Sequence, residues 1–515
     1  MTVLGALHLA VVAHIAWGHV RPLCVLVARL VRIHPKLHVT FFTVKANRSK
    51  IVAEIARNFE DGEGDLERQI RVVGLDGNEF NPMDTAELEN NFEQQLQNLV
   101  AGKAITCAAQ QTQIPALQQA PNALIVDIFH YSIMQIARRV SPQTKIWGSG
   151  SGSLASSFTL FGPFAQDSHG QQHELVHQHV AETGMEFIDA AFKLIASPSD
   201  KVIQGPGLLP MFKYENFPQD RPIKAPFVGL FYLSASSVIH ECDAYITQTA
   251  PIYEPPEGIK AFADFFAHRN TKMHMLGPLI PDTQRSAKIE LEQAAKAPEL
   301  VTFMQDALQK HGKNSLVYIA FGTLFWCMQP DRIWTVLDVL IERKTPFILS
   351  HASPFAKVPD EVAEKVEASG MGFLTSWAPQ QTVLEHPATG WFLSHGGFNS
   401  ITESIDAGVP LICWPFTADQ PLNALHLTEN LGIAYELLEV RTGSEATKPV
   451  YRTGKAPTCT LESVRAEAIF VFEKAFGEDG VKKRAAVQKL KESSLGLWKE
   501  GGSSRNAAQE LLESL

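Results

Sequence analysis

Many of the residues that could bind a ligand in this 515-residue chain lie in three polar clusters at fixed distances. They are Trp377–Gln380, His395–Glu403 and Asp419–Gln420. Each cluster follows an apolar run that predicts a buried strand, at residues 372–377, 391–394 and 410–414. An indole can stack on a planar base, a glycine loop can approach a phosphate, and a carboxylate beside an amide can bind neighbouring hydroxyls. Together these groups suit a nucleotide diphosphate sugar.

The middle cluster joins its strand to a helix that we expect from about Asn399 to Ala407. His395-Gly396-Gly397 allows the backbone to approach a ligand closely, and the helix terminus offers free N–H groups and a positive dipole end. Ser400 and Glu403 also have the Ser-x-x-Glu spacing of a capping box. A purely structural role for these two residues therefore stays open.

The 377–420 stretch resembles the signature box of family 1 UDP-dependent glycosyltransferases, of the type found in soluble plant enzymes. The resemblance covers length, order and motif letters, and it is specific because about a dozen positions must agree. It implies the GT-B fold class, which is α/β with two Rossmann-like doubly wound domains facing a cleft. It also implies a UDP-sugar as donor substrate. The contacts that it assigns are Trp377 on the uracil face, the Ala378 backbone on the uracil edge, Gln380 and Glu403 on the ribose, His395, Gly397, Asn399, Ser400 and Thr323 at the diphosphate, and Asp419 and Gln420 on the sugar.

Two residues depart from the plant pattern, which usually reads His-Cys-Gly-Trp-Asn-Ser. This chain has Gly396 in place of the Cys and Phe398 in place of the Trp. Gly396 should cost nothing in function, but Phe398 removes an indole N–H that could reach the sugar. The sequence therefore favours glucose as the donor sugar without fixing it.

His19 is the candidate general base. It follows a strand expected at Leu7–Ala13 and precedes a helix expected at Pro22–Ile33, where the helix dipole disfavours the imidazolium and keeps a base-competent ring. From the residues alone, a capping or core histidine would be the favoured interpretation. The resemblance identifies this position as the family's base, and it identifies Asp127, which ends the expected strand Ala123–Asp127, as its partner.

The resemblance implies inverting transfer of the sugar to a hydroxyl of a small lipophilic acceptor, such as a phenolic or terpenoid, which gives a β-glycoside. A metal cofactor is not expected, because the Asp-x-Asp motif of metal-dependent glycosyltransferases does not occur. The alternatives are a sterol or lipid glycosyltransferase, a UDP-sugar epimerase and a non-catalytic sugar-nucleotide binder. Residues 80–110 and 155–235 are expected to form the acceptor pocket, with Phe158, Phe161, Phe164, Phe227, Phe231 and Tyr232. In the Gly/Ser run 148–153, Ser149 or Ser151 could contact the donor.

A rival motif is His173-Glu-Leu-Val-His177, which matches the H-E-x-x-H pattern of zinc peptidases. His169, His173 and His177 would share one face of a helix. The metzincin extension fails, because position 180 is Val and position 183 is Thr. We therefore expect no metal site, and a metallopeptidase is disfavoured.

The two halves of the chain each predict a doubly wound α/β unit. We expect an N-terminal acceptor-binding domain at 1–276, a linker at 277–300, a UDP-sugar-binding domain at 301–480 and a C-terminal helix at 481–515 that returns to the first domain. Residues 205–270, rich in proline and aromatics, predict irregular structure. The strands expected in the first half are Leu7–Ala13, Leu37–Thr43, Arg71–Gly74, Ala123–Asp127, Lys145–Trp147 and Lys272–Leu276.

Composition narrows the cellular setting. The net charge of −10 argues against a nucleic-acid surface. Six cysteines far apart in sequence argue against zinc and disulfide frameworks and favour a reducing compartment. No apolar run reaches 18 residues, so a membrane span is not expected. We expect a cytoplasmic monomer.

Overall fold

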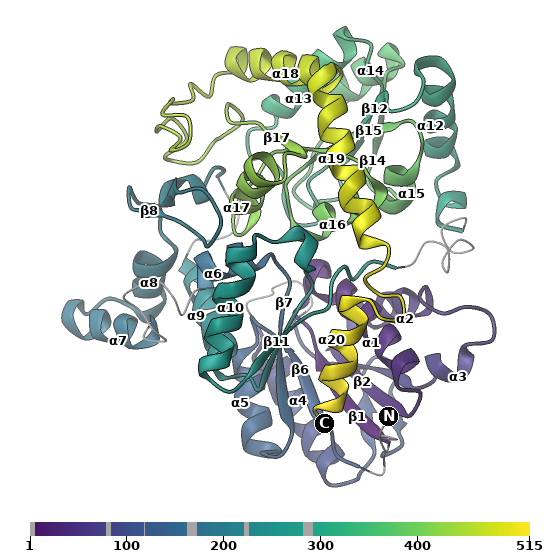
Figure 1. The fold of residues 1–515 in the computed structure, drawn as a ribbon, viewed down its shortest axis with the longest axis vertical. Helices are drawn as coiled ribbons and strands as arrows, with labels where there is room; N and C mark the ends of the chain where they lie inside the picture. The colour runs from purple at the N-terminus through teal and green to yellow at the C-terminus, as the bar shows by residue number, and fades with distance from the viewer. Residues whose placement is uncertain (1–5, 79–83, 118, 162–171, 221–225, 282–291) are drawn as a thin grey trace. The chain divides into compact units, whose positions relative to one another are not determined.

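The computed structural model describes the chain apart from residues 1–5, 79–83, 118, 162–171, 221–225 and 282–291. Its contacts divide the chain into two compact units. Unit 1 comprises residues 1–196, 225–287 and 496–515, and unit 2 comprises residues 197–224 and 288–495. Each unit is built on one parallel β-sheet with its own helices (Figure 1).

The sheet of unit 1 has seven parallel strands in the order β11-β10-β7-β6-β1-β2-β3. The strands are β1 Leu7–Val12, β2 Leu37–Val44, β3 Ile70–Leu75, β6 Ala123–Asp127, β7 Lys145–Gly150, β10 Ala244–Thr247 and β11 Lys272–Met275, with a separate antiparallel pair β4 Ile105–Cys107 and β5 Thr112–Ile114. The helices are α1 Trp17–Ile33, α2 Arg48–Ala56, α3 Gly64–Glu67, α4 Ala86–Val100, α5 Tyr131–Val140, α6 Leu154–Phe161, α7 Gln172–Thr183, α8 Phe187–Ala191, α9 Pro226–Glu241, α10 Pro256–His268 and α20 Ser503–Glu513, with short 3-10 turns at Lys45–Asn47 and Pro251–Tyr253 and a π turn at Phe192–Ala196.

This strand order places a topological switch point between β1 and β6. The chain proceeds from β1 through β2 to β3 on one side, and β6 begins the other side by pairing with β1 in register Val12↔Val126. The connections after β1 and β6 therefore diverge at the carboxyl edge of the sheet, which is where open α/β sheets bind ligands.

Helix α1 starts earlier than the sequence suggested. The expectation placed Pro22 near the first helical position, but the helix begins at Trp17 and Pro22 lies inside it. The first turn closes without Pro22, because the N–H groups of His19 and Val20 both donate to the Ala16 carbonyl. A proline at the sixth helical position loses one backbone bond and does not end the helix. His19 stays in the first turn, as expected.

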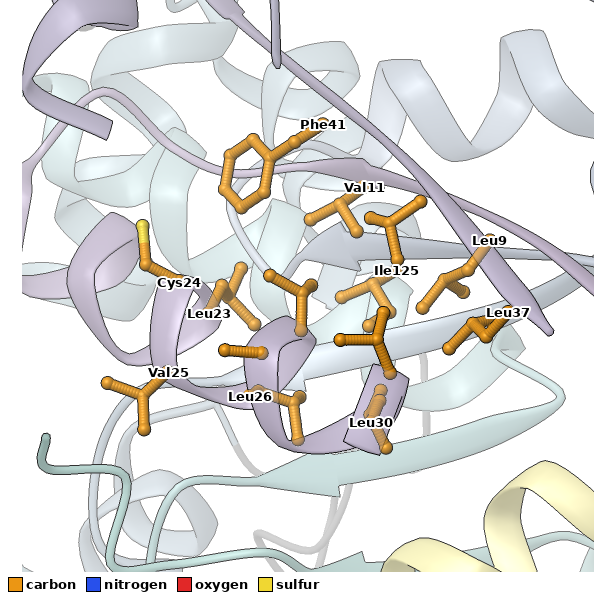
Figure 2. Close-up of a cluster of buried hydrophobic side chains, with 14 of the residues drawn as sticks. Leu9, Val11, Leu23, Cys24, Val25, Leu26, Leu30, Leu37, Phe41 and Ile125 are labelled. Carbon is orange, nitrogen blue, oxygen red and sulfur yellow. The ribbon is translucent and has the colours of Figure 1, made fainter. Parts of the chain in front are cut away.

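The core of unit 1 forms where α1 covers β1, β2 and β6 (Figure 2). Leu23, Leu26 and Leu30 lie on one face of α1 at helical spacing and are fully buried. They pack against a patch of strand residues. These are Leu9, Val11, Leu37, Phe41 and Ile125. This packing fixes α1, and with it His19, against the ends of β1 and β6.

The sheet of unit 2 has six parallel strands in the order β14-β13-β12-β15-β16-β17, with a switch point between β12 and β15. The strands are β12 Leu316–Ala320, β13 Phe347–Ser350, β14 Gly372–Thr375, β15 Thr389–Ser394, β16 Leu411–Cys413 and β17 Ala434–Glu436, with an antiparallel pair β8 Val202–Ile203 and β9 Met211–Phe212. The helices are α12 Pro298–His311, α13 Asp331–Glu342, α14 Asp360–Ser369, α15 Gln380–Glu385, α16 Phe398–Ala407, α17 Gln420–Leu425, α18 Leu461–Ala475 and α19 Glu478–Ser494, with a 3-10 turn at Lys213–Asn216 and a π turn at His426–Asn430.

The units differ from the expected domain boundaries in two segments. Residues 197–224, expected in the N-terminal domain, pack in unit 2, where Glu215 accepts a hydrogen bond from the Tyr451 N–H. The expected C-terminal helix is two helices, and α19 stays in unit 2 because Gln488 donates to the Gly408 carbonyl. Only residues from 496 onward return to unit 1.

Two further features concern the helices. Part of the 205–270 region, expected to be irregular, forms α9 and α10, because its aromatic residues pack as helix faces. Among the described residues, no helix combines the length and the apolar character that crossing a membrane would require.

Helix α20 yields a stability test for the return of the chain to unit 1. Leu511 is fully buried in the core shared with α1, so replacing it by Ala should destabilise unit 1 by about 2–5 kcal/mol. Urea unfolding measures the change. The control is Leu495→Ala, because Leu495 is 57% exposed and its truncation should stay within about 0.5 kcal/mol. Equal effects of the two substitutions would contradict the assignment of α20 to the core.

Candidate active site

The candidate base and its partner meet at the switch point of unit 1. Nδ1 of His19 lies 2.7 Å from Oδ2 of Asp127, which is the last residue of β6. The other oxygen of Asp127 accepts the Phe129 N–H at 3.0 Å. The ring of His19 therefore donates from Nδ1, which leaves the Nε2 lone pair to accept a proton.

Asp127 is ionised in this setting. Burial pushes the pKa of its carboxyl upward, but the charge and hydrogen bond of His19, together with His14 and His130, draw the pKa below its usual value. Asp127 is 1% exposed and His19 is 17% exposed. A buried carboxylate behind a partly open imidazole can stabilise the imidazolium that forms when His19 takes a proton.

Ser151 is a neighbour of His19 that the sequence only hinted at. Its hydroxyl lies 3.1 Å from Nδ1 and 3.2 Å from Nε2 of His19. Ser149, the other serine considered, lies within β7 and is 1% exposed. The loop between β7 and α6 thus brings one of the two serines to the base.

An aromatic cluster lies beside His19. The ring of Phe129 is 5.1 Å from that of His19 and 4.8 Å from that of Phe231. Phe161 contacts Phe129 and Tyr232 edge-on. Three of the aromatic residues expected in an acceptor pocket therefore gather near the base. Phe158 packs against Phe262, and the side chains of Phe164 and Phe227 lie outside the described residues.

In unit 2, two of the expected phosphate-binding residues directly follow neighbouring strands at the switch point. Thr323 follows β12 and is exposed, and His395 follows β15, which pairs with β12 in register Ala320↔Ser394. A Cβ on Gly397 would lie 2.5 Å from Nε2 of His395, so only glycine lets the loop fold this tightly over the ring. Gly396 has φ +77°, which suits glycine better than the Cys of the plant pattern.

The N-cap of α16 is Gly397, and no side chain caps this helix by a hydrogen bond. Asn399 and Ser400 are the second and third helical residues, so Ser400 is not an N-cap and does not form the Ser-x-x-Glu capping box considered from the sequence. Phe398 is the first helical residue, and its side chain is buried. The capping-box alternative for Ser400 and Glu403 is thus wrong, because the helix begins three residues earlier than that alternative requires.

Glu403 pairs with Gln380. Nε2 of Gln380, the first residue of α15, donates to Oε2 of Glu403 at 2.5 Å. The Tyr318 hydroxyl of β12 reaches Oε1 of Gln380 at 3.4 Å. The two expected ribose ligands are therefore adjacent, and Tyr318 is a further neighbour that the sequence did not indicate.

Trp377 is 46% exposed and lies two residues after the half-buried strand β14, so part of its indole is accessible. The backbone N–H of Trp377 donates to the Thr375 hydroxyl, which in turn donates to the Trp377 carbonyl at 2.7 Å. Ala378 is the half-buried residue between Trp377 and α15. An exposed, backbone-fixed indole is suited to stacking on a base.

Asp419 and Gln420 lie at the start of α17. Oε1 of Gln420 accepts the N–H groups of Phe416 and Thr417, so the carbonyl end of this amide holds the preceding loop. Oδ2 of Asp419 accepts from Asn423 at 2.7 Å. Asn423 had no sequence signal, because an asparagine within a short helix follows no motif.

The rival zinc motif lies on α7. Nε2 of His173 lies 2.9 Å from the Ser237 hydroxyl, and the ring of His177 contacts Phe187. His169 lies outside the described residues. In the part of the chain that the structure describes, no three His, Cys, Asp or Glu side chains gather as metal ligands would.

His395 gives a pH test. Burial lowers the pKa of His395 to about 4 from its ordinary 6.5. Between these values the unfolded chain binds more protons than the folded chain, so the free energy of unfolding falls as the pH falls. Over the full window the loss approaches about 3 kcal/mol.

His395→Gln should remove this pH dependence. Urea unfolding of both proteins at pH 7.5 and pH 5 should show the wild type losing about 2 kcal/mol more than the variant. Comparison with the variant is needed because burial also lowers the pKa of His8 to about 4. Parallel pH dependences would contradict the burial of a neutral His395.

Known proteins share both the sequence and the fold of this chain. The family model described as UDP-glucoronosyl and UDP-glucosyl transferase matches residues 266–446. UDP-glycosyltransferase eriJ of Hericium erinaceus is 30% identical over 98% of this chain and 98% of its own length. UDP-glycosyltransferase 72E1 of Arabidopsis thaliana is 25% identical, covering 95% of this chain and 91% of its own.

Solved structures match across both units. Medicago truncatula UGT71G1 complexed with UDP-glucose has a TM-score of 0.69 at 20% identity, covering 99% of this chain and 98% of its own. A UGT transferase from Siraitia grosvenorii in complex with UDP also has a TM-score of 0.69, at 19% identity and 99% coverage of both chains. These matches and the two parallel sheets confirm the predicted GT-B fold class of two Rossmann-like domains. The chain belongs to the UDP-glycosyltransferases and is an enzyme of that family.

Proposed function

We propose that this enzyme transfers glucose from UDP-glucose to a hydroxyl of a small lipophilic acceptor, with inversion, to give a β-glycoside. The observation that carries the proposal is the 2.7 Å contact between His19 and the buried Asp127. Inverting transfer needs a base for the acceptor hydroxyl, and a buried carboxylate behind an imidazole supplies one.

In the proposed reaction, the acceptor O–H gives its proton to Nε2 of His19. The oxygen attacks the anomeric carbon from the face opposite UDP, the bond from that carbon to the diphosphate oxygen breaks, and UDP leaves. Asp127 stabilises the imidazolium. The negative charge that develops on the diphosphate meets His395, Thr323 and the amino end of α16.

For the donor, we propose that Trp377 stacks on the uracil, with the Ala378 backbone at its edge. Gln380 and Glu403 take the ribose, and Asp419 and Gln420 take the sugar. The exposed indole and the Gln380–Glu403 hydrogen bond support this arrangement. UGT71G1, a fold neighbour, is described in complex with UDP-glucose.

For the acceptor, the aromatic cluster at His19 favours a planar phenolic compound. Phe129, Phe161 and Phe231 offer ring edges and faces, and aromatic pairs of this kind gain about 0.5–1.5 kcal/mol beyond burial. Among the relatives, one is named as a flavonol 3-O-glucosyltransferase and another as an anthocyanidin 3-O-glucosyltransferase. A phenolic acceptor therefore ranks before a sterol.

The test is incubation with UDP-glucose and a panel of phenols, terpenoids and sterols, with UDP release and glycoside mass as readouts. UDP release only in the presence of a phenol, with a β anomeric coupling in the product, is the expected result. His19→Ala should lower turnover by about 10²–10⁴-fold while UDP binding persists. His268→Ala, at an exposed position, is the control.

Other outcomes would select another function. UDP-sugar conversion without any acceptor indicates an epimerase, and donor binding without turnover indicates a binding protein. Glycosylation of sterols alone indicates a lipid glycosyltransferase. Undiminished turnover in His19→Ala would remove His19 as the base.

Glu403→Gln tests the ribose site separately. The substitution keeps the shape of the side chain but removes the charge that would strengthen its bonds to hydroxyls, so UDP affinity should fall by about tenfold. Calorimetric titration measures this affinity, and thermal unfolding controls for stability. A lower melting temperature with unchanged UDP affinity would show a structural role only.

A further inference from the structure

Asn423 connects two parts of the donor half of the enzyme. It lies in α17 and is 2% exposed. Its Nδ2 donates to the Gly396 carbonyl at 3.0 Å and to Oδ2 of Asp419 at 2.7 Å. A side-chain amide has two N–H groups, so both are used, and the plane of the amide is fixed.

The two acceptors belong to different functional segments. Gly396 is the left-handed residue of the loop between His395 and α16, and Asp419 precedes α17. One planar amide therefore sets the carboxylate of Asp419 relative to the loop that leads to the amino end of α16. The Asn423 N–H also donates to the Asp419 carbonyl, so side chain and backbone act on the same residue.

Gln420 does not duplicate this connection. Its Oε1 holds the loop at Phe416 and Thr417, on the strand β16 side of α17. Removing the Asn423 amide would leave the Gly396 carbonyl and the Asp419 carboxylate each short of one buried donor. The half-buried carboxylate of Asp419 would then be free to reorient, because its orientation is held by its hydrogen bonds.

We propose that Asn423 is a positioning residue for the donor sugar. By bonding both Asp419 and the Gly396 carbonyl, it orients the carboxylate of Asp419 toward the sugar. The inference rests on the proposed sugar contact of Asp419. It assigns Asn423 no contact with substrate. Its signature is a loss of affinity for the sugar part of the donor that is larger than any loss for UDP.

The test measures the dissociation constants of UDP and UDP-glucose by calorimetry and compares their ratio among variants. Asn423→Ala should weaken UDP-glucose about tenfold, as loss of one charge-assisted hydrogen bond would, and UDP less than about threefold. Asn423→Asp keeps the shape and replaces the donor by an oxygen facing two acceptors, so it should shift the ratio in the same direction. Asn430→Ala is the matched control, because Asn430 is exposed and bonds only the Gly207 carbonyl among the described contacts.

A double-mutant cycle separates aiming from general packing. If Asn423 acts through Asp419, adding Asn423→Ala to Asp419→Ala should leave the ratio unchanged. Equal losses for UDP and UDP-glucose, or additive effects on the ratio, overturn the inference. Thermal unfolding of each variant shows whether a loss of fold accompanies a loss of affinity.

Failure of the proposed function gives a different pattern. If Asp419→Ala shifts the ratio and Asn423→Ala does not, the sugar contact holds and the inference is overturned. If neither substitution shifts the ratio, Asp419 does not bind the sugar, and both statements fall. The UDP affinity of Trp377→Ala then tests the uracil site independently of Asp419. A reduced affinity supports that site, and an unchanged affinity contradicts it.

Discussion

The structure depends on one constraint of parallel sheets, which is that neighbouring strands on either side of a switch point send their connections in opposite directions. In unit 1 this occurs between β1 and β6, and in unit 2 between β12 and β15. His19 follows β1 and Asp127 ends β6. Likewise, Thr323 follows β12 and His395 follows β15. Each group of candidate site residues is therefore assembled from distant parts of the sequence by strand order alone.

The two switch points hold opposite electrostatic arrangements. At β6, the pKa of buried Asp127 lies below its usual value, and Nδ1–H of His19 donates a hydrogen bond to this carboxylate. At β15, burial lowers the pKa of His395 and keeps its ring neutral. The first arrangement suits taking up a proton. The second suits donating hydrogen bonds to an anion without a permanent positive charge in the apolar interior.

Local patterns predicted what depends on local forces. The apolar run ending in Asp127 predicted the bounds of β6, and the alternation of strand and helix patterns predicted two doubly wound α/β units, whereas the GT-B class came from the family resemblance. The start of α1 was missed because Pro22 is a typical first helical residue, whereas here the preceding turn closes on the Ala16 carbonyl. The Ser-x-x-Glu spacing of Ser400 and Glu403 was ambiguous, because either Ser400 or Gly397 could be the N-cap of the helix.

Long-range packing explains what the sequence left open. Residues 197–224 were placed with unit 1 by chain order, but Glu215 and its neighbours find their partners more than 200 residues later. No spacing in the sequence marks Asn423, which meets its partners only in space, and the Gly/Ser run left Ser149 and Ser151 both open until the fold brought Ser151 to His19. The proposed roles of the site residues likewise depend on ligands, so they remain predictions for the experiments on UDP affinity and turnover.

The interleaving of the two units has a consequence for biosynthesis. Ala508, Leu511 and Leu512 complete the core that α1 builds with the first strands, yet they are synthesised after residues 288–495 of unit 2. Unit 2 likewise needs a segment made before most of its own chain. Part of the apolar surface of the first sheet therefore stays uncovered while unit 2 is being synthesised.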